Sequence, residues 1–425
     1  MGCRSAWPCA GTSSTPVNDG LGVGLFPIPI PCSLRYNADM LARLYATNYR
    51  CLVNFEFRPT AKQLIIGRNG TGKTTVFDVL AMLRDVAVSG LTLEGHVGGK
   101  TRTNWQSVAE QRFELDVKGN GGEYRYTLVL DELVPRQEAR RAAFAGAGVP
   151  GPRPRIVQET LDFDGKPLFR FLEGTIGLFN DQQRPTPSVE FQFDWHRSGL
   201  AIVEIGRWDN TKLTWFKEWL GRLVHVQINP WAMSVRSERE SIDPARDLGN
   251  FADWYRHLRL ASGNAVFEAL AALREAIPGL EALDAQNAGL DVKVLQATLR
   301  SPNKASVALP FSDLSEGQRV LIGLYVLLYC AVEKDRTLLI DEPDNFIALA
   351  EIQPWLMKLL DRVDETDGQV ILISHHPELL DQLACQGGVL LDRPDGSETR
   401  VLPFAPLEDS GLKPSEIIAR GWEIG

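Results

Sequence analysis

The sequence predicts an α/β fold in which helices flank a mostly parallel sheet, with a β-rich N-terminal lobe and a helical insertion added to it. Two observations predict the sheet. A glycine-rich loop joins a short apolar strand to a helix, and two apolar strands that end in polar residues follow much later in the chain. Strands buried on both faces are typical of parallel sheets, and their carboxyl ends meet at one ligand-binding edge.

The glycine-rich loop is the first element of a candidate site. Residues 67–74, GRNGTGKT, match the phosphate-binding pattern G-x-x-x-x-G-K-[ST]. Glycines let backbone N–H groups approach phosphates, and the N-terminus of the following helix adds partial positive charge. We expect Lys73 to reach the β- and γ-phosphates and the Thr74 hydroxyl to bind Mg²⁺. The residues expected to bind the nucleotide here are Gly67, Arg68, Asn69, Gly70, Thr71, Gly72, Lys73, Thr74 and Thr75.

Two carboxylates end the apolar run that begins at Thr337. Asp341 and Glu342 follow Leu338, Leu339 and Ile340, so a buried parallel strand would bring them to the ligand edge of the sheet. In that position Asp341 is expected to hold Mg²⁺, and Glu342 to act as the general base on the attacking water.

A capping box opens the helix predicted over residues 320–332. Ser315 and Gln318 have the spacing at which each side chain bonds the backbone of the other. A capped helix N-terminus with Gly317 beside it also suits an anion. We expect Ser315, Gly317 and Gln318 to close over the γ-phosphate of a nucleotide held by another subunit.

A third apolar run, Gln369 to Ile373, precedes Ser374, His375 and His376. A histidine at the ligand edge can hydrogen-bond a phosphate oxygen or a positioned water. One histidine of this pair is therefore expected to be functional, and His375 is the candidate.

Together, the motifs GRNGTGKT, LSEGQ, LLIDEP and ILISHH resemble the ABC-type P-loop ATPase head of RecF, SMC and overcoming-lysogenization-defect proteins. Within that class the chain most resembles compact bacterial AAA family ATPases, over residues 40–425. The resemblance implies hydrolysis of ATP to ADP and phosphate with Mg²⁺, and heads that dimerise so that Ser315 and Gly317 act in trans. It also implies a glutamine that links Mg²⁺ to the attacking water. Gln111 fits best, and Gln106 is the alternative.

Composition narrows the classes of partner. The net charge of −9 argues against coating nucleic acid by bulk electrostatics. Six scattered cysteines predict neither a zinc site nor a disulfide framework, and the longest apolar run is too short to span a bilayer. We therefore expect a cytoplasmic protein with no membrane partner. A local basic cluster around the loop 142–154 is interpreted as solvated; its members are Arg136, Arg140, Arg141, Arg153 and Arg155.

The chain divides into four predicted parts. Residues 1–39 are expected to be a disordered leader, and we hypothesise that Met40 is the native start. Residues 40–204 form the N-terminal lobe, 205–305 a largely helical insertion, and 306–425 the C-terminal lobe. An apolar stripe over residues 251–277 is expected to be core; its members are Trp254, Tyr255, Leu258, Leu260, Phe267, Leu270 and Leu273.

Three functions fit these observations. The leading hypothesis is an ATP-driven switch, a homodimer or higher homo-oligomer, that transmits conformational change to a partner. The second is a defence-system sensor or scaffold ATPase that holds an effector nuclease or toxin. The third is a DNA-repair ATPase that acts directly on DNA. The sequence does not name the partner.

Overall fold

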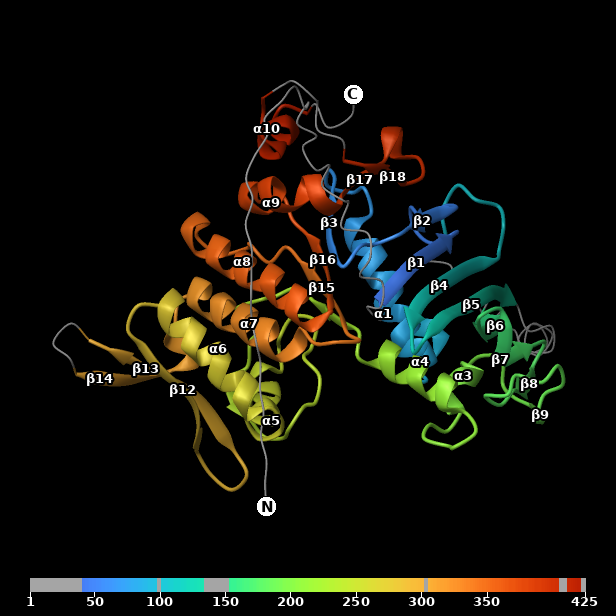
Figure 1. Cartoon of the computed structure of the whole chain (residues 1–425), viewed down its shortest axis with the longest axis horizontal. Helices are drawn as coiled ribbons and strands as arrows, with labels where there is room; N and C mark the ends of the chain where they lie inside the picture. Colours follow the sequence, from blue (N-terminus) through green and yellow to red (C-terminus); the bar gives the residue numbers. More distant parts are fainter. Residues whose placement is uncertain (1–39, 98–100, 134–152, 302–304, 405–410, 422–425) are drawn as a thin grey trace, which may run out of the picture. The chain divides into compact units, whose positions relative to one another are not determined.

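The computed structural model describes residues 40–97, 101–133, 153–301, 305–404 and 411–421, all within the unit Asn37–Gly425 (Figure 1). The apolar runs around the candidate site form one sheet. Its strands, in spatial order, are β10 (Val224–Val226), β15 (Thr337–Asp341), β16 (Gln369–Ile373), β3 (Lys62–Ile66), β17 (Gly388–Asp392) and β18 (Arg400–Pro403). Neighbours from β10 to β17 are parallel, and β18 is antiparallel to β17. The strands that carry the predicted site residues therefore end at one edge.

Alternate residues of this sheet enter different cores, because successive side chains of a strand point to opposite faces. Leu64 and Ile66 join one core, and Ile65 between them joins the other. The first core is covered by α5 (Phe251–Ala261), α6 (Gly263–Ala276), α7 (Glu316–Ala331), α8 (Leu349–Thr366) and α9 (Pro377–Gly387). The second core contains α1 (Lys73–Ala87), α3 (Gly199–Ile202) and α4 (Thr211–Gly221). A short helix, α10 (Pro414–Ala419), follows the last strand.

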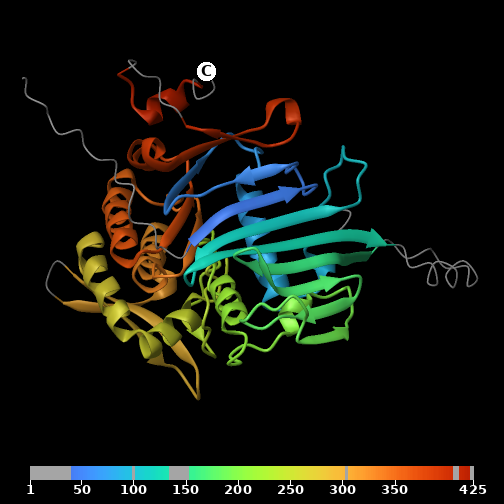
Figure 2. The same ribbon diagram turned by 45° about the vertical axis from the view of Figure 1, so that its right-hand side comes forward.

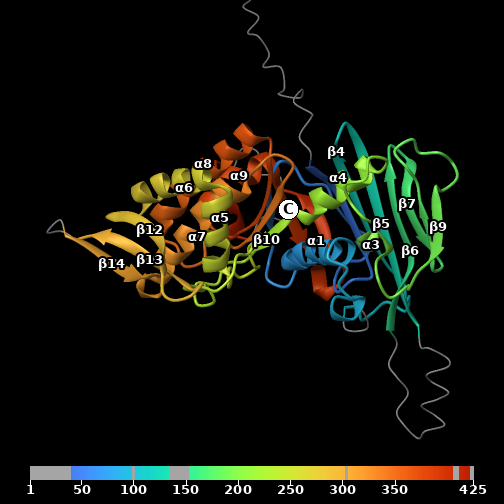
Figure 3. The same cartoon turned by 90° about the horizontal axis from the view of Figure 1, so that it is seen from below.

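An antiparallel sheet covers the other side of the second core (Figure 2). Its strands, in spatial order, are β2 (Phe55–Phe57), β1 (Met40–Thr47), β4 (Gln111–Gly119), β5 (Gly122–Leu133), β6 (Arg153–Phe163), β7 (Lys166–Leu172), β8 (Thr175–Leu178) and β9 (Val189–Gln192). A two-residue hairpin turn joins β4 to β5: Asn120 and Gly121 both have positive φ, as a type I′ turn requires. Since α1 shares the core with both sheets, it packs between them (Figure 3).

The segment 205–305 contains the predicted helices but also strands that the sequence analysis did not predict. Here β11 (Arg236–Ser237), β13 (Lys293–Arg300) and β12 (Leu280–Asn287) form a third sheet, which β14 (Ser306–Pro310) extends. Many residues of β12 are polar and half-exposed, so apolar alternation, the usual signal of a strand, is weak there.

The predicted apolar stripe over residues 251–277 is wrong at two positions. Leu260 and Phe267 are 69% and 68% exposed, whereas Trp254 and Leu273 are buried. The segment forms the two helices that the pattern predicts, but Leu260 and Phe267 each lie off the buried face of their own helix. Leu260 follows the buried Leu258 by two positions in α5, and Phe267 follows the buried Val266 by one position in α6. Residues one or two positions apart on a helix point in different directions, so both side chains face outward.

Some sequence-based expectations fall outside the described residues. The leader expected at residues 1–39 is one of them, and so are Arg136, Arg140 and Arg141 of the basic cluster. In the described part of the chain, the structure has no helix both long and apolar enough to cross a membrane.

Candidate functional site

The glycine-rich loop joins β3 to α1, as the sequence predicts, and its glycines are needed for steric reasons. A Cβ on Gly67, which has a φ of 148°, would lie 2.3 Å from the carbonyl oxygen of Leu391. A Cβ on Gly72, at φ 97°, would lie 2.6 Å from the Cys51 sulfur. Gly72 is also the N-cap of α1 and offers no capping side chain. The first-turn N–H groups of α1 are therefore left for an anion.

Lys73 is held under this loop. Its Nζ donates to the carbonyl oxygens of Gly67, at 2.6 Å, and Arg68, at 3.1 Å. Burial lowers the pKa of Lys73, and the negative charges of Glu342 and Asp341 oppose that shift. The ammonium group is thus placed among backbone oxygens and within the field of both carboxylates.

Thr74 and Asp341 meet across the sheet edge. The Thr74 hydroxyl donates to Oδ2 of Asp341 at 2.9 Å. Burial raises the pKa of Asp341, the Thr74 hydrogen bond lowers it, and the neighbouring charge of Glu342 raises it again. A hydroxyl and a carboxylate are the hard oxygen ligands that Mg²⁺ prefers. These two side chains therefore fit a magnesium ion, which would neutralise phosphate charge.

Glu342 lies at the end of β15 in the left-handed region, with a φ of 52°. Such a conformation costs a non-glycine residue about 1–3 kcal/mol and is frequent at functional sites. Two contacts hold the residue in place. Its N–H donates to the Ile373 carbonyl at 2.8 Å, and its Oε2 accepts from Nδ2 of Asn345 at 2.8 Å. The carboxylate lines the same cavity as Lys73 and Thr74.

The two histidines after β16 have different environments. His376 caps α9, since its Nδ1 accepts from the Glu378 N–H at 3.2 Å. His375 is exposed, and burial of part of its ring together with the charge of Lys73 lowers its pKa, against the effect of Glu342. The structure therefore gives His376 a structural contact and leaves His375 beside the site.

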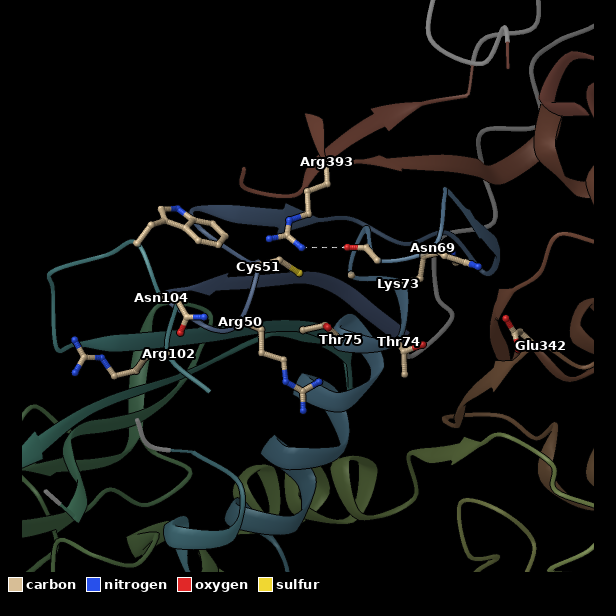
Figure 4. A pocket seen from close by; sticks show the side chains of 13 residues that line it. Arg50, Cys51, Asn69, Lys73, Thr74, Thr75, Arg102, Asn104, Glu342 and Arg393 are labelled. Carbon is tan, nitrogen blue, oxygen red and sulfur yellow. Dashed lines mark hydrogen bonds between the residues drawn. The ribbon is translucent and has the colours of Figure 1, made fainter. Parts of the chain in front are cut away.

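The cavity at this edge has a volume of about 540 Å³. Residues predicted from the motifs line it, among them Asn69, Lys73, Thr74, Thr75 and Glu342. Sequence reasoning missed other lining residues, which are Arg50, Cys51, Arg102, Asn104, Trp105 and Arg393. Figure 4 shows Arg393 and Asn104 on one side of the glycine-rich loop and Glu342 on the other. The missed residues lie on connections, for which the sequence carries no periodic signal.

A family model described as "AAA domain, putative AbiEii toxin, Type IV TA system" matches residues 64–184 and 234–381, more than half of the chain. The chain belongs to this family. The match confirms the resemblance to AAA family ATPases with a P-loop, and with it the assignment as an ATP-binding protein. Both matched segments contain site residues: the first includes the glycine-rich loop, and the second includes Ser315, Asp341, Glu342 and His375.

Two of the solved structures that match the chain are SMC heads. An SMC head domain from Thermotoga maritima is 14% identical, with a TM-score of 0.45, and the match covers 86% of this chain and 99% of that one. An SMC head bound to the C-winged helix domain of ScpA is 11% identical, also with a TM-score of 0.45, and the match covers 85% and 98%. No curated protein matches the chain.

Gln111, the candidate for the glutamine of this AAA-domain family member, is buried at the start of β4. Its Nε2 donates to the Asn48 carbonyl at 2.8 Å, and it is not among the residues that line the described cavity. The alternative, Gln106, follows Trp105, which does line the cavity. The contact with Asn48 explains why Gln111 points elsewhere in this arrangement: the Asn48 carbonyl is buried and takes the amide as its donor.

The predicted capping box is confirmed at the N-terminus of α7. The Ser315 hydroxyl accepts from the Gln318 N–H at 3.3 Å, and the Ser315 N–H donates to Gln318 Oε1 at 3.1 Å. The helix begins at Glu316, before the first residue of the predicted helix, because the box already caps it there. A Cβ on Gly317 would lie 2.9 Å from the Phe346 carbonyl, so α7 starts against the loop that follows Glu342. Ser315 is exposed and stands apart from the lining of the cavity.

The described members of the basic cluster have acidic neighbours. Arg153 lies 3.7 Å from Glu94 and Arg155 lies 3.5 Å from Asp131. Arg155 also stacks over the Trp195 ring, with its Cζ 5.2 Å from the centroid. These contacts agree with the interpretation of this pair as ordinary surface charges.

Proposed function

We propose that the protein binds ATP with Mg²⁺, hydrolyses it to ADP and phosphate, and uses this cycle to close and reopen two copies of the chain head to head. The movement is transmitted to a partner. The observation that carries the proposal is the contact between Thr74 and Asp341, at 2.9 Å, beside Lys73 and Glu342. It supports the proposal because phosphate-binding, metal-binding and general-base groups from distant segments meet in one cavity.

Each group has a role that follows from its position. The N–H groups of the glycine-rich loop and the Lys73 ammonium balance the phosphate charge. Thr74 and Asp341 would hold the magnesium ion. The Glu342 carboxylate accepts the proton of the attacking water, and the neutral imidazole of His375 can hydrogen-bond a phosphate oxygen.

The positions of Ser315, Gly317 and Gln318 are the reason for proposing that two copies of the chain share each site. Ser315 and Gln318 satisfy each other's backbone groups, and the N-terminus of α7 is exposed away from the cavity of its own chain. A capped N-terminus with partial positive charge suits the γ-phosphate of a nucleotide held by a second copy. Ser315, Gly317 and Gln318 would then complete the site in trans.

Calorimetry with Mg²⁺ and ATP tests the binding step. Wild-type protein is expected to bind ATP, and Lys73→Ala is expected to lose affinity by about tenfold or more, because the phosphates lose a buried cation. Lys166→Ala is the matched control, since Lys166 is exposed in β7. Equal ATP affinity in the wild type and Lys73→Ala would rule out the site.

The family description favours one second candidate. The matched model is described by a putative toxin of a Type IV TA system. A sensor or scaffold ATPase that holds an effector nuclease or toxin is therefore proposed as the alternative form of the switch. Affinity purification of tagged Glu342→Gln protein from its source with ATP is expected to retain the effector, and Lys73→Ala protein is expected to release it. Identical recovery with both variants would contradict this candidate.

A further inference from the structure

A tryptophan lies in a part of the cavity that has no role in the proposed chemistry. Trp105 lines the cavity that also contains Lys73 and Glu342, and its side chain is 48% exposed. The Arg393 guanidinium lies over its ring, with Cζ 5.5 Å from the centroid. An indole half-exposed in a cavity presents a flat apolar surface to any planar ligand that enters.

Arg393 is fixed by backbone oxygens on two segments. Its Nε donates to the Ser397 carbonyl at 2.7 Å and its Nη2 to the Gly396 carbonyl at 2.8 Å. Its Nη1 donates to the Gly70 carbonyl at 3.3 Å, a contact drawn as a dashed line in Figure 4. Arg393 therefore connects the tryptophan to the glycine-rich loop and sets the position of the ring relative to the phosphate site.

The segment that carries Trp105 is held by its own hydrogen bonds. The Thr103 N–H donates to Oδ1 of Asn48 at 3.2 Å, and the Gln106 N–H donates to the Thr103 carbonyl at 3.0 Å. Arg102 Nη2 donates to the Val108 carbonyl at 2.8 Å. This turn holds Asn104 and Trp105 at the cavity wall, so both side chains are presented by a built loop.

We infer that Trp105 and Arg393 form the base-binding platform of the site, and that the base is a purine. The inference rests on the proposed binding of a nucleoside triphosphate. The loop binds the phosphates, so the base extends toward the far end of the cavity, where Arg393 and Asn104 lie opposite Glu342 (Figure 4). A purine offers the larger surface for stacking on an indole, and the guanidinium adds a cation–π contribution.

Asn104 is the residue expected to hydrogen-bond to the edge of the base. Its amide both donates and accepts, which matches the N6 donor and N7 acceptor of adenine in a bidentate pair. The arginines around the cavity only donate. Adenine, the base of the proposed ligand ATP, is therefore a purine that Asn104 can bind in this way.

The test separates the base from the phosphates by comparing ATP with inorganic tripolyphosphate, both with Mg²⁺, in calorimetry on the full chain. Trp105→Ala is expected to lose about tenfold in ATP affinity and to keep its tripolyphosphate affinity. Trp105→Phe, which retains an aromatic face, should recover most of the ATP affinity. The ATP affinity of Arg393→Ala should lie between those of Trp105→Ala and Trp105→Phe. The control is Trp208→Ala, because Trp208 is 87% exposed outside the cavity.

Three outcomes would overturn the inference. The first is a Trp105→Ala protein that binds ATP as the wild type does, while Lys73→Ala loses both ligands; the proposed function then stands without this platform. The second is an equal loss of both ligands in Trp105→Ala, which means that the ring shapes the phosphate loop. The third is equal affinity of the wild type for CTP and ATP, since a purine platform discriminates between them. If the wild type binds neither ATP nor tripolyphosphate, the proposed function itself fails.

Discussion

Thr74 Oγ1 lies 2.9 Å from Asp341 Oδ2, although 267 positions separate the two residues in the chain. The contact joins the N-terminus of α1 to the end of β15, two strands away from β3 across β16. Both oxygens are suited to one magnesium ion. The parallel sheet thus brings the two side chains of the proposed magnesium site within hydrogen-bonding distance of each other.

The first prediction concerns this pair. Thr74→Val keeps the shape of the side chain but removes the hydroxyl, so the gain in ATP affinity on adding Mg²⁺ should fall by about tenfold. Titration of Mg²⁺ at fixed ATP measures the gain. Thr298→Val in β13 is the control and should behave as the wild type. An unaltered Mg²⁺ dependence in Thr74→Val would exclude the hydroxyl as a ligand.

The second prediction concerns Glu342. Glu342→Gln preserves size and removes the base, so hydrolysis should fall at least about a hundredfold while ATP stays bound. Trapped ATP should then hold two copies together, and light scattering should report twice the 47.2 kDa of the single chain. The double variant with Lys73→Ala should stay monomeric. A Glu342→Gln protein that remains monomeric at saturating ATP would count against sites shared between copies.

The third prediction tests Ser315 in trans. Ser315→Arg places a bulky side chain on the exposed N-terminus of α7 and should abolish ATPase activity, as should Lys73→Ala. Mixing the two proteins should restore activity, because both defects then fall on one of the two shared sites. Circular dichroism confirms that each variant is folded. No recovery on mixing folded variants would remove Ser315 from the site.

The fourth prediction separates two glutamines. Gln111→Ala leaves the buried Asn48 carbonyl without its donor, so stability should fall by about 1–2 kcal/mol in chemical denaturation. Gln106→Ala should leave stability unchanged and lower kcat more strongly, since its neighbour Trp105 lines the cavity. A fall in kcat in Gln111→Ala at full stability would instead support the role implied by the family resemblance.

The fifth prediction concerns pH and His225 of β10. Burial, together with the charge of Arg246, lowers the pKa of His225 from 6.5 to about 3. Below pH 6.5 the unfolded chain binds a proton that the folded chain rejects, so this residue's contribution to stability is present above that pH and is lost on acidification. The slope is up to about 1.4 kcal/mol per pH unit. His225→Leu should flatten the acid side of the profile of unfolding free energy against pH, measured by chemical denaturation.

The parts that the sequence predicted are those that local chemistry determines. A glycine-rich loop between an apolar strand and a helix has few conformations, and the capping box at Ser315 specifies where α7 begins. Strand ends such as Asp341 and Glu342 were placed because parallel strands share an edge. Each of these signals lies within a few neighbouring residues.

The site residues that the sequence did not predict lie on connections between strands and helices, and their positions depend on how the chain folds in three dimensions. Trp105 and Arg393 come from separate loops and meet over the cavity, and neither lies in a periodic segment. The family resemblance implies that Gln111 links the ion to the attacking water, but its amide donates to the carbonyl of Asn48, a residue of the bend after β1. Such contacts follow from tertiary packing, which propensity and spacing do not report.

The alternation of side chains between the two faces of the central sheet has a consequence for thermal unfolding. Leu338 and Ile340 of β15 enter one core and Leu339 enters the other. The single layer of this sheet therefore forms a wall of both cores. Neither core can melt without exposing the opposite face of that wall. Heating should therefore give one calorimetric transition for residues 37–425, with no separately denaturing lobe. Shortening a buried side chain on either face of the sheet should lower this single melting temperature. The ligand-binding edge of the sheet should be lost at the same temperature.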